Sequence, residues 1–376
     1  MRAYAATRAV ALLERNAPGS RPNGNFESPQ RIAVAFGSVN GALGTPDVLQ
    51  DVGPRVAGAD LAVDPRGDAV AVWIQARDTT RTGVALNDRL WISTRRAGGS
   101  FTTPTVLVGS GRIESVDAAV GANGDILVAF TREAIVRGRE RRPRTVAVRS
   151  RRAGHRFGAI QTVGPNEGFA DIATAIASNG RGYVAWGTQD LGEEANEPFR
   201  VYAAVKPAGP NAFRPGAQLD DGGGGLERPV GDVSIAVAPN AEATVAWSGV
   251  RTARSTGDLQ VFCPVFAAST GADARFSAAQ PVAGGNGAVG GVTVAPSGVA
   301  TVVWTALRPG VFAEPTGVLA AQRAAGATPF GPAETVTDQP PGANDSPPAV
   351  GLDPGSGQPV VAFTGRGGLF VSARTG

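Results

Sequence analysis

Five aspartates stand at comparable places along the chain, each shortly before a run of apolar residues. They are Asp60, Asp117, Asp171, Asp232 and Asp345. If these carboxylates converged, their oxygens would suit a hard cation such as Ca²⁺ or the hydroxyl groups of a sugar. The alternative is that aspartate begins a strand because its side chain stabilises the preceding turn. The places drift by one or two residues between copies, which favours the turn-stabilising role and leaves ligand binding as the second hypothesis.

Two later segments carry a high density of like charge. The first holds five arginines and the second a pair of glutamates: Arg137, Arg139, Arg141, Arg142 and Arg144, then Glu193 and Glu194. Such arginines are candidates for binding an anion, and paired glutamates are candidates for the carboxylates of a glycosidase. No aromatic residues are interleaved for base stacking, which argues against a nucleic-acid partner. We favour mutual neutralisation of the two segments over either kind of site.

Several kinds of catalytic site are excluded by residue counts. Cys263 is the only cysteine, so the chain forms no intrachain disulfide and no thiolate cluster around a metal. His155 is the only histidine and falls in a tight turn, away from the other candidates for a catalytic triad or a metal site. The glycine-rich segment Asp220–Gly225 lacks the Lys-Ser/Thr pair of a phosphate-binding loop. The catalytic residues therefore stay unknown, and we expect no metal and no cofactor, with Ca²⁺ as the one candidate ion.

The composition is that of a folded protein with a substantial core. Hydrophobic residues make up 42% of the 376 residues and charged residues 18%, which argues against disorder. The net charge is +3, and Lys206 is the sole lysine among 35 basic residues, a bias typical of GC-rich coding. No apolar run approaches the length of about 18 residues that a membrane span requires. The apolar run Ala9–Leu13 is too short for the core of a signal peptide. We expect a monomer without a membrane span.

An apolar motif that ends in a large anchor residue, aromatic in all but the first copy, returns at a nearly constant interval. The anchors are separated by 60, 57, 56, 61, 57 and 59 residues and lie at Leu13, Trp73, Phe130, Trp186, Trp247, Trp304 and Phe363. A repeat of this length indicates supersecondary units that stack on one another.

Each repeat contains four apolar runs, which we interpret as β-strands. The first ends in a turn rich in proline, asparagine and glycine, as at Asp64–Gly67. The second is the anchor motif, apolar at nearly every position, as expected of a strand between two sheets. The third runs are Arg31–Phe36, Arg89–Thr94, Arg144–Arg149, Arg200–Ala204, Leu259–Phe262, Gly317–Ala321 and Gly368–Ser372. The fourth runs fit outer edge strands: Phe101–Leu107, Phe157–Val163, Phe213–Leu219, Phe276–Val282 and Phe330–Val336.

Four antiparallel strands in each of about seven repeats predict an all-β chain folded as a β-propeller of four-stranded blades. We expect a single domain over residues 1–376, with repeats at 1–55, 56–112, 113–168, 169–228, 229–286, 287–343 and 344–376. The first and last blades are incomplete, so seven blades are favoured and six is the alternative. A β-solenoid is disfavoured because its repeats are shorter than these.

The two ends of the chain are uneven. The first copy begins inside its first strand, at Met1–Ala6, and the last copy stops after its third strand. Propellers often close by letting one terminus complete a blade that the other began, so the missing outer strand is expected upstream of Met1. A start site placed too late would explain this arrangement, and an export signal would then precede it. On that hypothesis the protein is extracellular or lies on the cell surface; otherwise its location stays open.

The turn after the third strand resembles the Asp-box, the Ser-x-Asp-x-Gly-x-x-aromatic repeat of sialidase-like propellers. Ser150–Phe157 matches at the serine, glycine and aromatic places but has Arg152 in place of the aspartate. Thr94–Phe101 matches less well, with Arg96 in that place. The resemblance implies a sialidase-like propeller with degenerate Asp-boxes and does not transfer sialidase activity.

Strand order determines which connections share a face. The loops from fourth to first strand and from second to third strand lie on one face, and the tight turns lie on the other. Ligands usually bind where several longer loops form a concave surface. We therefore expect a noncatalytic propeller that recognises a carbohydrate or a protein partner on its loop face. The alternative is a carbohydrate-active hydrolase, glycosidase or sialidase-like, that uses loop-face carboxylates.

Overall fold

The structure, a computed structural model, describes most of the chain as strands and tight turns. The described residues are 2–5, 8–16, 30–37, 44–51, 56–76, 88–109, 111–133, 144–165, 168–190, 200–209, 212–220, 233–249, 251–255, 258–271, 273–308, 314–326, 329–338, 347–353, 356–365 and 368–373. These residues form no helix, and thus none long and apolar enough to cross a membrane.

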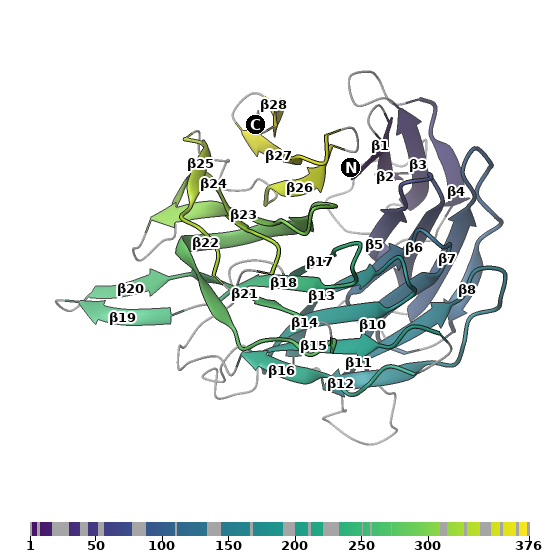
Figure 1. Cartoon of the computed structure of the whole chain (residues 1–376). Helices are drawn as coiled ribbons and strands as arrows, with labels where there is room; N and C mark the ends of the chain where they lie inside the picture. Colours follow the sequence, from purple (N-terminus) through teal and green to yellow (C-terminus); the bar gives the residue numbers. More distant parts are fainter. Residues whose placement is uncertain are drawn as a thin grey trace. The chain divides into compact units, whose positions relative to one another are not determined.

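The chain divides into two compact units, Met1–Asn166 and Glu167–Gly376. Each unit is built from antiparallel sheets whose strands pair in chain order (Figure 1). The all-β class and the four-stranded repeat are therefore confirmed. The single domain over residues 1–376 and the number of blades, seven or six, stay predictions.

The first unit contains three four-stranded sheets among its described residues. Their strands are β1 (Arg2–Ala5), β2 (Arg8–Asn16), β3 (Gln30–Gly37) and β4 (Asp47–Asp51); β5 (Val56–Val63), β6 (Ala69–Ala76), β7 (Asp88–Arg95) and β8 (Thr105–Val108); and β9 (Val116–Val120), β10 (Ile126–Glu133), β11 (Arg144–Arg151) and β12 (Gln161–Pro165). The first and fourth strands of each repeat lie at the two edges of its sheet. The apolar second strands are interior, which explains why they lack polar alternation.

The second unit continues this pattern with two variations. Its main strands are β13 (Gly168–Ile176), β14 (Gly182–Asp190), β15 (Arg200–Lys206) and β16 (Ala217–Asp220); β17 (Ser234–Val237), β18 (Ala243–Ser248), β21 (Pro264–Ser269), β22 (Gln280–Val294), β23 (Ala300–Arg308), β24 (Glu314–Arg323) and β25 (Glu334–Thr337); and β26 (Ala349–Leu352), β27 (Pro359–Gly365) and β28 (Gly368–Ala373). Strand β22 ends one repeat and begins the next, because its first part pairs with β21 and its later part with β23. The resulting sheet has seven strands, whereas β26, β27 and β28 form a three-stranded sheet.

The recurring aromatic anchors lie in the core, as predicted. Those on β6, β10, β14, β18 and β23 are fully buried: Trp73, Phe130, Trp186, Trp247 and Trp304. Trp73, for example, packs in one cluster with Ile32 and Val34 of the preceding sheet. Burial of a side chain of this size contributes roughly 3 kcal/mol. The anchors thus hold neighbouring four-stranded repeats together, as the blades of a β-propeller.

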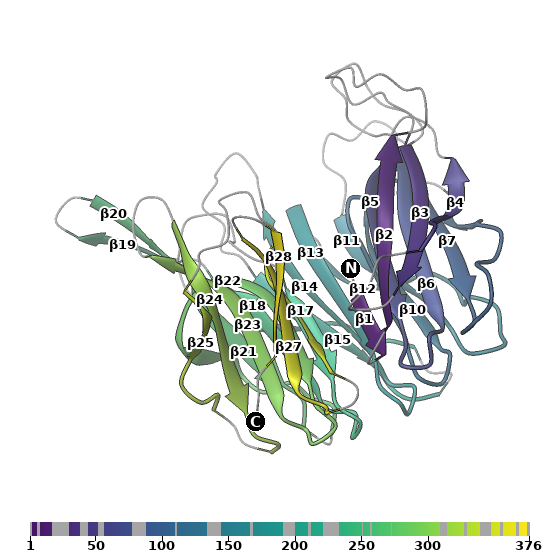
Figure 2. The same cartoon turned by 90° about the horizontal axis from the view of Figure 1, so that it is seen from above.

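One predicted third strand is wrong. The run Leu259–Phe262 lies in β20 (Asp258–Phe262), which pairs with β19 (Arg251–Ser255) in a separate two-stranded sheet. The third strand of that repeat is β21, in which Phe266 lies opposite Trp247. The hairpin is an insertion whose apolar alternation matches that of a third strand, so periodicity alone does not separate the two. Figures 1 and 2 show the hairpin projecting from the sheet to which β21 belongs.

The fourth strands begin later than predicted. Strands β8, β12, β16, β22 and β25 each start four residues after the predicted position. In the first case, Phe101 forms an isolated bridge with Arg95, and the strand itself begins at Thr105. A register shift also interrupts the pairing of β7 with β8. Such irregularity is typical of an edge strand and explains why the strand is short.

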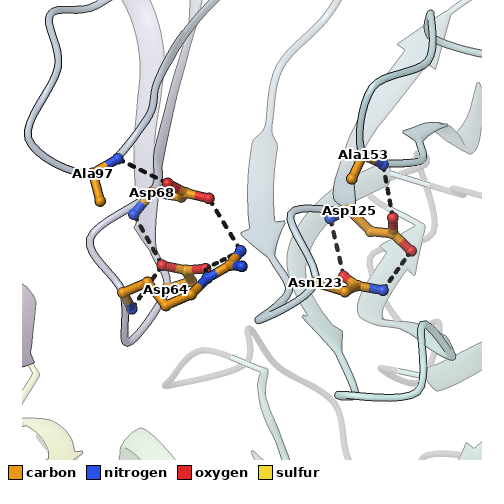
Figure 3. Close-up of polar contacts among 7 residues, drawn as sticks. Asp64, Asp68, Ala97, Asn123, Asp125 and Ala153 are labelled. Carbon is orange, nitrogen blue, oxygen red and sulfur yellow. Dashed lines mark hydrogen bonds and ion pairs between the residues drawn. The ribbon is translucent and has the colours of Figure 1, made fainter.

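Aspartates of the first hairpin join the tight turns within a sheet. Asp68, which follows the turn between β5 and β6, accepts a hydrogen bond through Oδ1 from Ala97 N at 2.8 Å. Asp125 accepts one from Ala153 N at 2.9 Å in the same way (Figure 3). Each alanine directly follows the arginine that stands where an Asp-box has its aspartate. A carboxylate from a different turn of the same sheet therefore binds this part of the backbone, and the Asp-box resemblance itself stays a prediction.

Candidate functional site

Charged side chains gather at one end of the sheet formed by β9, β10, β11 and β12. At this end Gly111–Ser115 lead into β9, Thr131–Glu133 end β10, and Arg144 begins β11. It is the end at which the fourth-to-first and second-to-third connections meet, and we call it the loop end. Its charged residues Arg112, Glu114, Glu133 and Arg144 are the loop-end cluster.

The four side chains of the loop-end cluster are joined to one another by ion pairs. Glu133 Oε2 lies 3.3 Å from Arg112 Nη1 and 3.6 Å from Arg144 Nε. Glu114 lies 2.5 Å from Arg112 Nη2 through Oε1 and 3.7 Å from Arg144 Nη1 through Oε2. Each carboxylate is thus shared between both guanidinium groups. Glu133 is the least exposed member, at 13%, and Arg112 the most exposed, at 31%.

Backbone contacts hold the loop-end cluster in place. Glu133 and Arg144 lie directly opposite each other in the pairing of β10 with β11. Glu133 N donates to Arg112 O at 2.9 Å, which fixes the connection that precedes β9. Thr131 Oγ1 accepts from Glu114 N at 3.0 Å and so anchors the same segment to β10. The charged groups are therefore positioned on regular strands and their ends, a condition for a preorganised site.

The loop-end cluster offers both kinds of hydrogen-bonding group to a polar ligand. Its carboxylates accept hydrogen bonds, and its guanidinium groups donate them in a planar fork. Ion pairs of partly exposed side chains contribute only about 0–1 kcal/mol each. A ligand with several hydroxyl or acidic groups can therefore replace one partner at small cost.

Asp60, the first of the predicted aspartates, links two sheets. Its Oδ2 accepts a hydrogen bond from Ala118 N at 2.9 Å, which joins the first strands β5 and β9. Ser234 occupies the same place in a repeat of the second unit, where its Oγ accepts from Val292 N at 3.1 Å. A serine therefore serves where an aspartate would, as expected for a backbone tether. This contact gives Asp60 a structural role, and its ligand role stays a prediction.

The structure places two further predicted aspartates on first strands. Asp117, on β9, lies opposite Ala129 of β10, which is the same place in the repeat as that of Asp60. Asp171, on β13 in the second unit, lies opposite Gly187 of β14. Its place in the repeat is two residues earlier than that of Asp60. The remaining candidates, Asp232, Asp345, Arg137, Arg139, Arg141, Arg142, Glu193 and Glu194, lie outside the described residues. Their roles stay predictions.

Sequence reasoning missed three members of the loop-end cluster, Arg112, Glu114 and Glu133. Glu133 ends a second strand and Arg144 begins a third, so pairing the two strands from the ends that lie nearest in the sequence would have placed these residues opposite each other. The positions of Arg112 and Glu114 depend on hydrogen bonds to β10, for which the sequence carries no signal.

The described part of the chain holds no group of three or more His, Cys, Asp or Glu side chains that could bind a metal ion. Cys263 is buried, and burial raises the pKa of its thiol to about 11. His155 lies exposed in the turn between β11 and β12, at the opposite end of the sheet from the loop-end cluster.

Comparisons with known proteins match the fold and not the sequence. No protein-family model matches the chain, and no curated protein is similar to it in sequence. Among solved structures, the polysaccharide lyase Uly1 is 10% identical over 98% of this chain and 90% of its own, with a TM-score of 0.53. The GH93 α-L-arabinofuranosidase of Fusarium graminearum is 14% identical over 85% and 92%, with a TM-score of 0.47. The NanB sialidase of Streptococcus pneumoniae is 10% identical over 98% and 65%, with a TM-score of 0.44. At these identities the likeness to Uly1 shows a shared β-propeller fold and nothing about activity.

Proposed function

We propose that the protein is a carbohydrate-active β-propeller protein that holds a polysaccharide at the loop end of the sheet formed by β9 to β12 and cleaves it. The observation that carries this proposal is the loop-end cluster, in which Glu114 and Glu133 are held beside Arg112 and Arg144 at a partly exposed strand end. Sugar hydroxyls donate to carboxylates and accept from guanidinium groups, so this set of side chains suits a sugar ring.

Cleavage of a polysaccharide requires a positioned group that takes or gives a proton. Glu133 is our candidate for that group, because it is held opposite Arg144 in the strand pairing and is half as exposed as Glu114, at 13% against 26%. The two arginines are then available to orient the sugar through their forked N–H groups. These roles are part of the proposal.

The fold supports carbohydrate as the substrate class. The polysaccharide lyase Uly1 has a similar fold along nearly the whole of this chain. A fold hosts many functions, so this likeness supports the proposal only together with the loop-end cluster.

The second candidate function is noncatalytic recognition of a carbohydrate or protein at the same loop end. One observation favours it: the only histidine, His155, lies in a tight turn at the far end of its sheet, so the commonest general base is not at the loop end. A protein that binds a polysaccharide without releasing products would match this candidate.

A panel of neutral and uronate-containing polysaccharides, including arabinan and polygalacturonate, tests the two candidates. Binding is measured by affinity electrophoresis and cleavage by the release of reducing ends. We expect the wild-type protein to cleave at least one polysaccharide that it binds. We expect Glu133→Gln to lose that cleavage while thermal unfolding shows that it stays folded.

Glu314→Gln is the matched control, because Glu314 is also paired with an arginine, at 3.8 Å from Arg308, but is 70% exposed and lies in the second unit. It should cleave like the wild type. Binding without products from any polysaccharide would refute cleavage and support the second candidate. Equal loss of cleavage in Glu133→Gln and Glu314→Gln would show that the loop-end cluster is not the site of cleavage.

A further inference from the structure

Arginines also gather at the turn ends of two sheets in the first unit, opposite to the loop end. Five of them lie in or beside the turns that connect β7 with β8 and β11 with β12: Arg95, Arg96, Arg151, Arg152 and Arg156. We call these five residues the basic turn surface. Arg96, Arg152 and Arg156 are exposed, and Arg95 and Arg151 are partly buried.

Three described carboxylates of the neighbouring turns, Asp64, Asp68 and Asp125, are engaged by the turns themselves (Figure 3). Asp64 accepts hydrogen bonds from Arg66 N and Asp68 N through Oδ1, each at 2.9 Å, and from Arg66 Nε through Oδ2 at 3.0 Å. Asp68 binds Ala97 N and also Arg66 Nη2, the latter at 3.1 Å. Arg66 is thereby neutralised, which is why it is not counted in the basic turn surface.

Asp125 is engaged in the same manner in the next sheet. Its Oδ1 accepts from Ala153 N at 2.9 Å and its Oδ2 from Asn123 Nδ2 at 3.0 Å. Among the described residues, no carboxylate forms an ion pair with any of the five arginines of the basic turn surface. The aspartates of these turns are therefore bound within the turns, and no described carboxylate pairs with the five arginines to offset their positive charge.

The turns of the two sheets lie beside each other. A Cβ atom placed on Gly124, in the turn between β9 and β10, would lie 3.7 Å from Arg66 Nη2 of the neighbouring sheet. Burial, and in addition the like charge of Arg96, lower the pKa of Arg151. The two groups of arginines are thus part of one surface. The turns have open space at Gly98 and Gly154, because a Cβ placed on either residue would meet no atom within 4 Å.

The chemistry of the surface favours one class of partner. Like charges held together without paired carboxylates attract a polyanion, and guanidinium forks match carboxylate and sulfate groups. The large hydrophobic side chains that are exposed among the described residues are Val48, Val106, Phe370 and Val371, and none lies in these turns. Phe101 and Phe157 also lie in these turns but are partly buried, and Arg151 covers the ring of Phe157 at 5.2 Å from its centroid. The described part of the surface therefore has no exposed Phe, Tyr or Trp ring for base stacking and no apolar wedge for a membrane.

We propose that the basic turn surface is a second binding site, specific for anionic polysaccharides that carry carboxylate or sulfate groups. Its exposed arginines contact successive acidic groups along the glycan, while the aspartate-bound turns hold the backbone rigid beneath them. This site is separate from the loop end and does not depend on whether the loop-end cluster cleaves a substrate.

Heparin, dextran and a double-stranded DNA oligonucleotide test the site by titration against the whole protein at several NaCl concentrations. We expect heparin to bind and dextran not to bind. We expect Arg96→Ser/Arg152→Ser to weaken heparin binding about tenfold near physiological salt and to reduce the slope of log K against log[NaCl] by about two. The double variant removes only exposed side chains, so its thermal unfolding should match that of the wild type.

Arg275→Ser/Arg308→Ser is the matched control, because it removes the same charge from side chains that are 84% and 71% exposed in the second unit. It should change heparin affinity less than twofold. Equal weakening in both double variants would show a net-charge effect and overturn the site. DNA binding as tight as heparin binding would overturn the assignment to a glycan. Glu133→Gln should leave heparin binding at this surface unchanged, so failure here is distinct from failure at the loop end.

Discussion

The indole nitrogen of Trp73 donates a hydrogen bond to Gln50 Oε1 at 3.2 Å, across two neighbouring four-stranded repeats. The acceptor lies on the outer strand β4 of the preceding sheet, opposite Ile32. Trp247 repeats the relationship in the second unit, where its Nε1 donates to Asp220 Oδ2 at 3.1 Å. At these two anchors the sheets are thus joined by a polar contact as well as by packing, whereas the buried Nε1 of Trp304 has no hydrogen-bond partner among the described residues.

In three repeats the outer-strand residue matches the anchor that it faces. Gln50 and Asp220 occupy the same place in their repeats, opposite Ile32 and Val201. In the repeat before Phe130, that place is held by Val108, opposite Leu90. A phenyl ring has no donor to satisfy, so an apolar partner suffices there.

We predict that Gln50→Ala lowers the free energy of unfolding by about 1–3 kcal/mol, because it leaves the fully buried donor of Trp73 without its acceptor. Gln75→Ala is the control, since Gln75 accepts from Trp91 Nε1 at 2.9 Å but Trp91 is only partly buried and water can replace the bond. Its cost should be smaller. Chemical denaturation measures both, and equal costs would contradict the role given to the buried contact.

We predict that Asp60→Ala destabilises the protein by about 1–2 kcal/mol, because Ala118 N loses its acceptor in a buried position. Asp60→Asn keeps a carbonyl oxygen at the same place and should lose less than half as much. Urea denaturation of the two variants separates the tether from a charge effect. A larger loss in the asparagine variant would show that the negative charge, and not the acceptor, matters.

The fold could be predicted because its signals act over short distances in the sequence. The spacing of Trp73, Phe130 and the later anchors marks the second strands, and the glycine turns mark where hairpins close. The hairpin of β19 and β20 could not be recognised, because a short apolar run at Leu259–Phe262 satisfies the same pattern as a third strand.

The loop-end cluster was harder to predict than the fold. Arg112 reaches Glu133 only because the backbone of one segment bonds to the end of another strand. Nothing in the spacing of the two residues indicates that contact. Asp60, by contrast, was expected near the entry to a first strand and lies within one, β5, but a strand position does not reveal whether a carboxylate faces a ligand or a neighbouring amide.

We predict that Gly154→Ala costs about 1 kcal/mol of stability through its backbone alone. Gly154 has φ of 75°, and a Cβ there would meet no atom within 4 Å, so strain in the left-handed region is the one effect of the substitution on the folded state. Gly109→Ala is the matched control, because its Cβ would also meet no atom within 4 Å but its φ lies outside that region. It should be neutral or stabilising by up to about 1 kcal/mol. A similar cost in both variants would contradict the assignment to φ.

We predict that Cys263 reacts with a thiol reagent at mildly alkaline pH about 100-fold more slowly in the folded than in the unfolded protein. Burial raises the pKa of the thiol from 9.0 to about 11, which lowers the thiolate fraction, and the side chain is 1% exposed. Between these two values the unfolded state releases a proton that the folded state retains, so stability falls as pH rises from about 9 to about 11. Absorbance of the released thiol product with and without guanidinium measures the ratio, and comparable rates would contradict the burial of Cys263.

Binding of a carbohydrate at the loop end is tested by amide hydrogen exchange of the wild-type protein with and without the polysaccharide that the panel identifies. We expect added protection in Gly111–Val116 and Thr131–Glu133, where the loop-end cluster lies. Saturating polysaccharide that leaves both segments unchanged would contradict binding at the loop end.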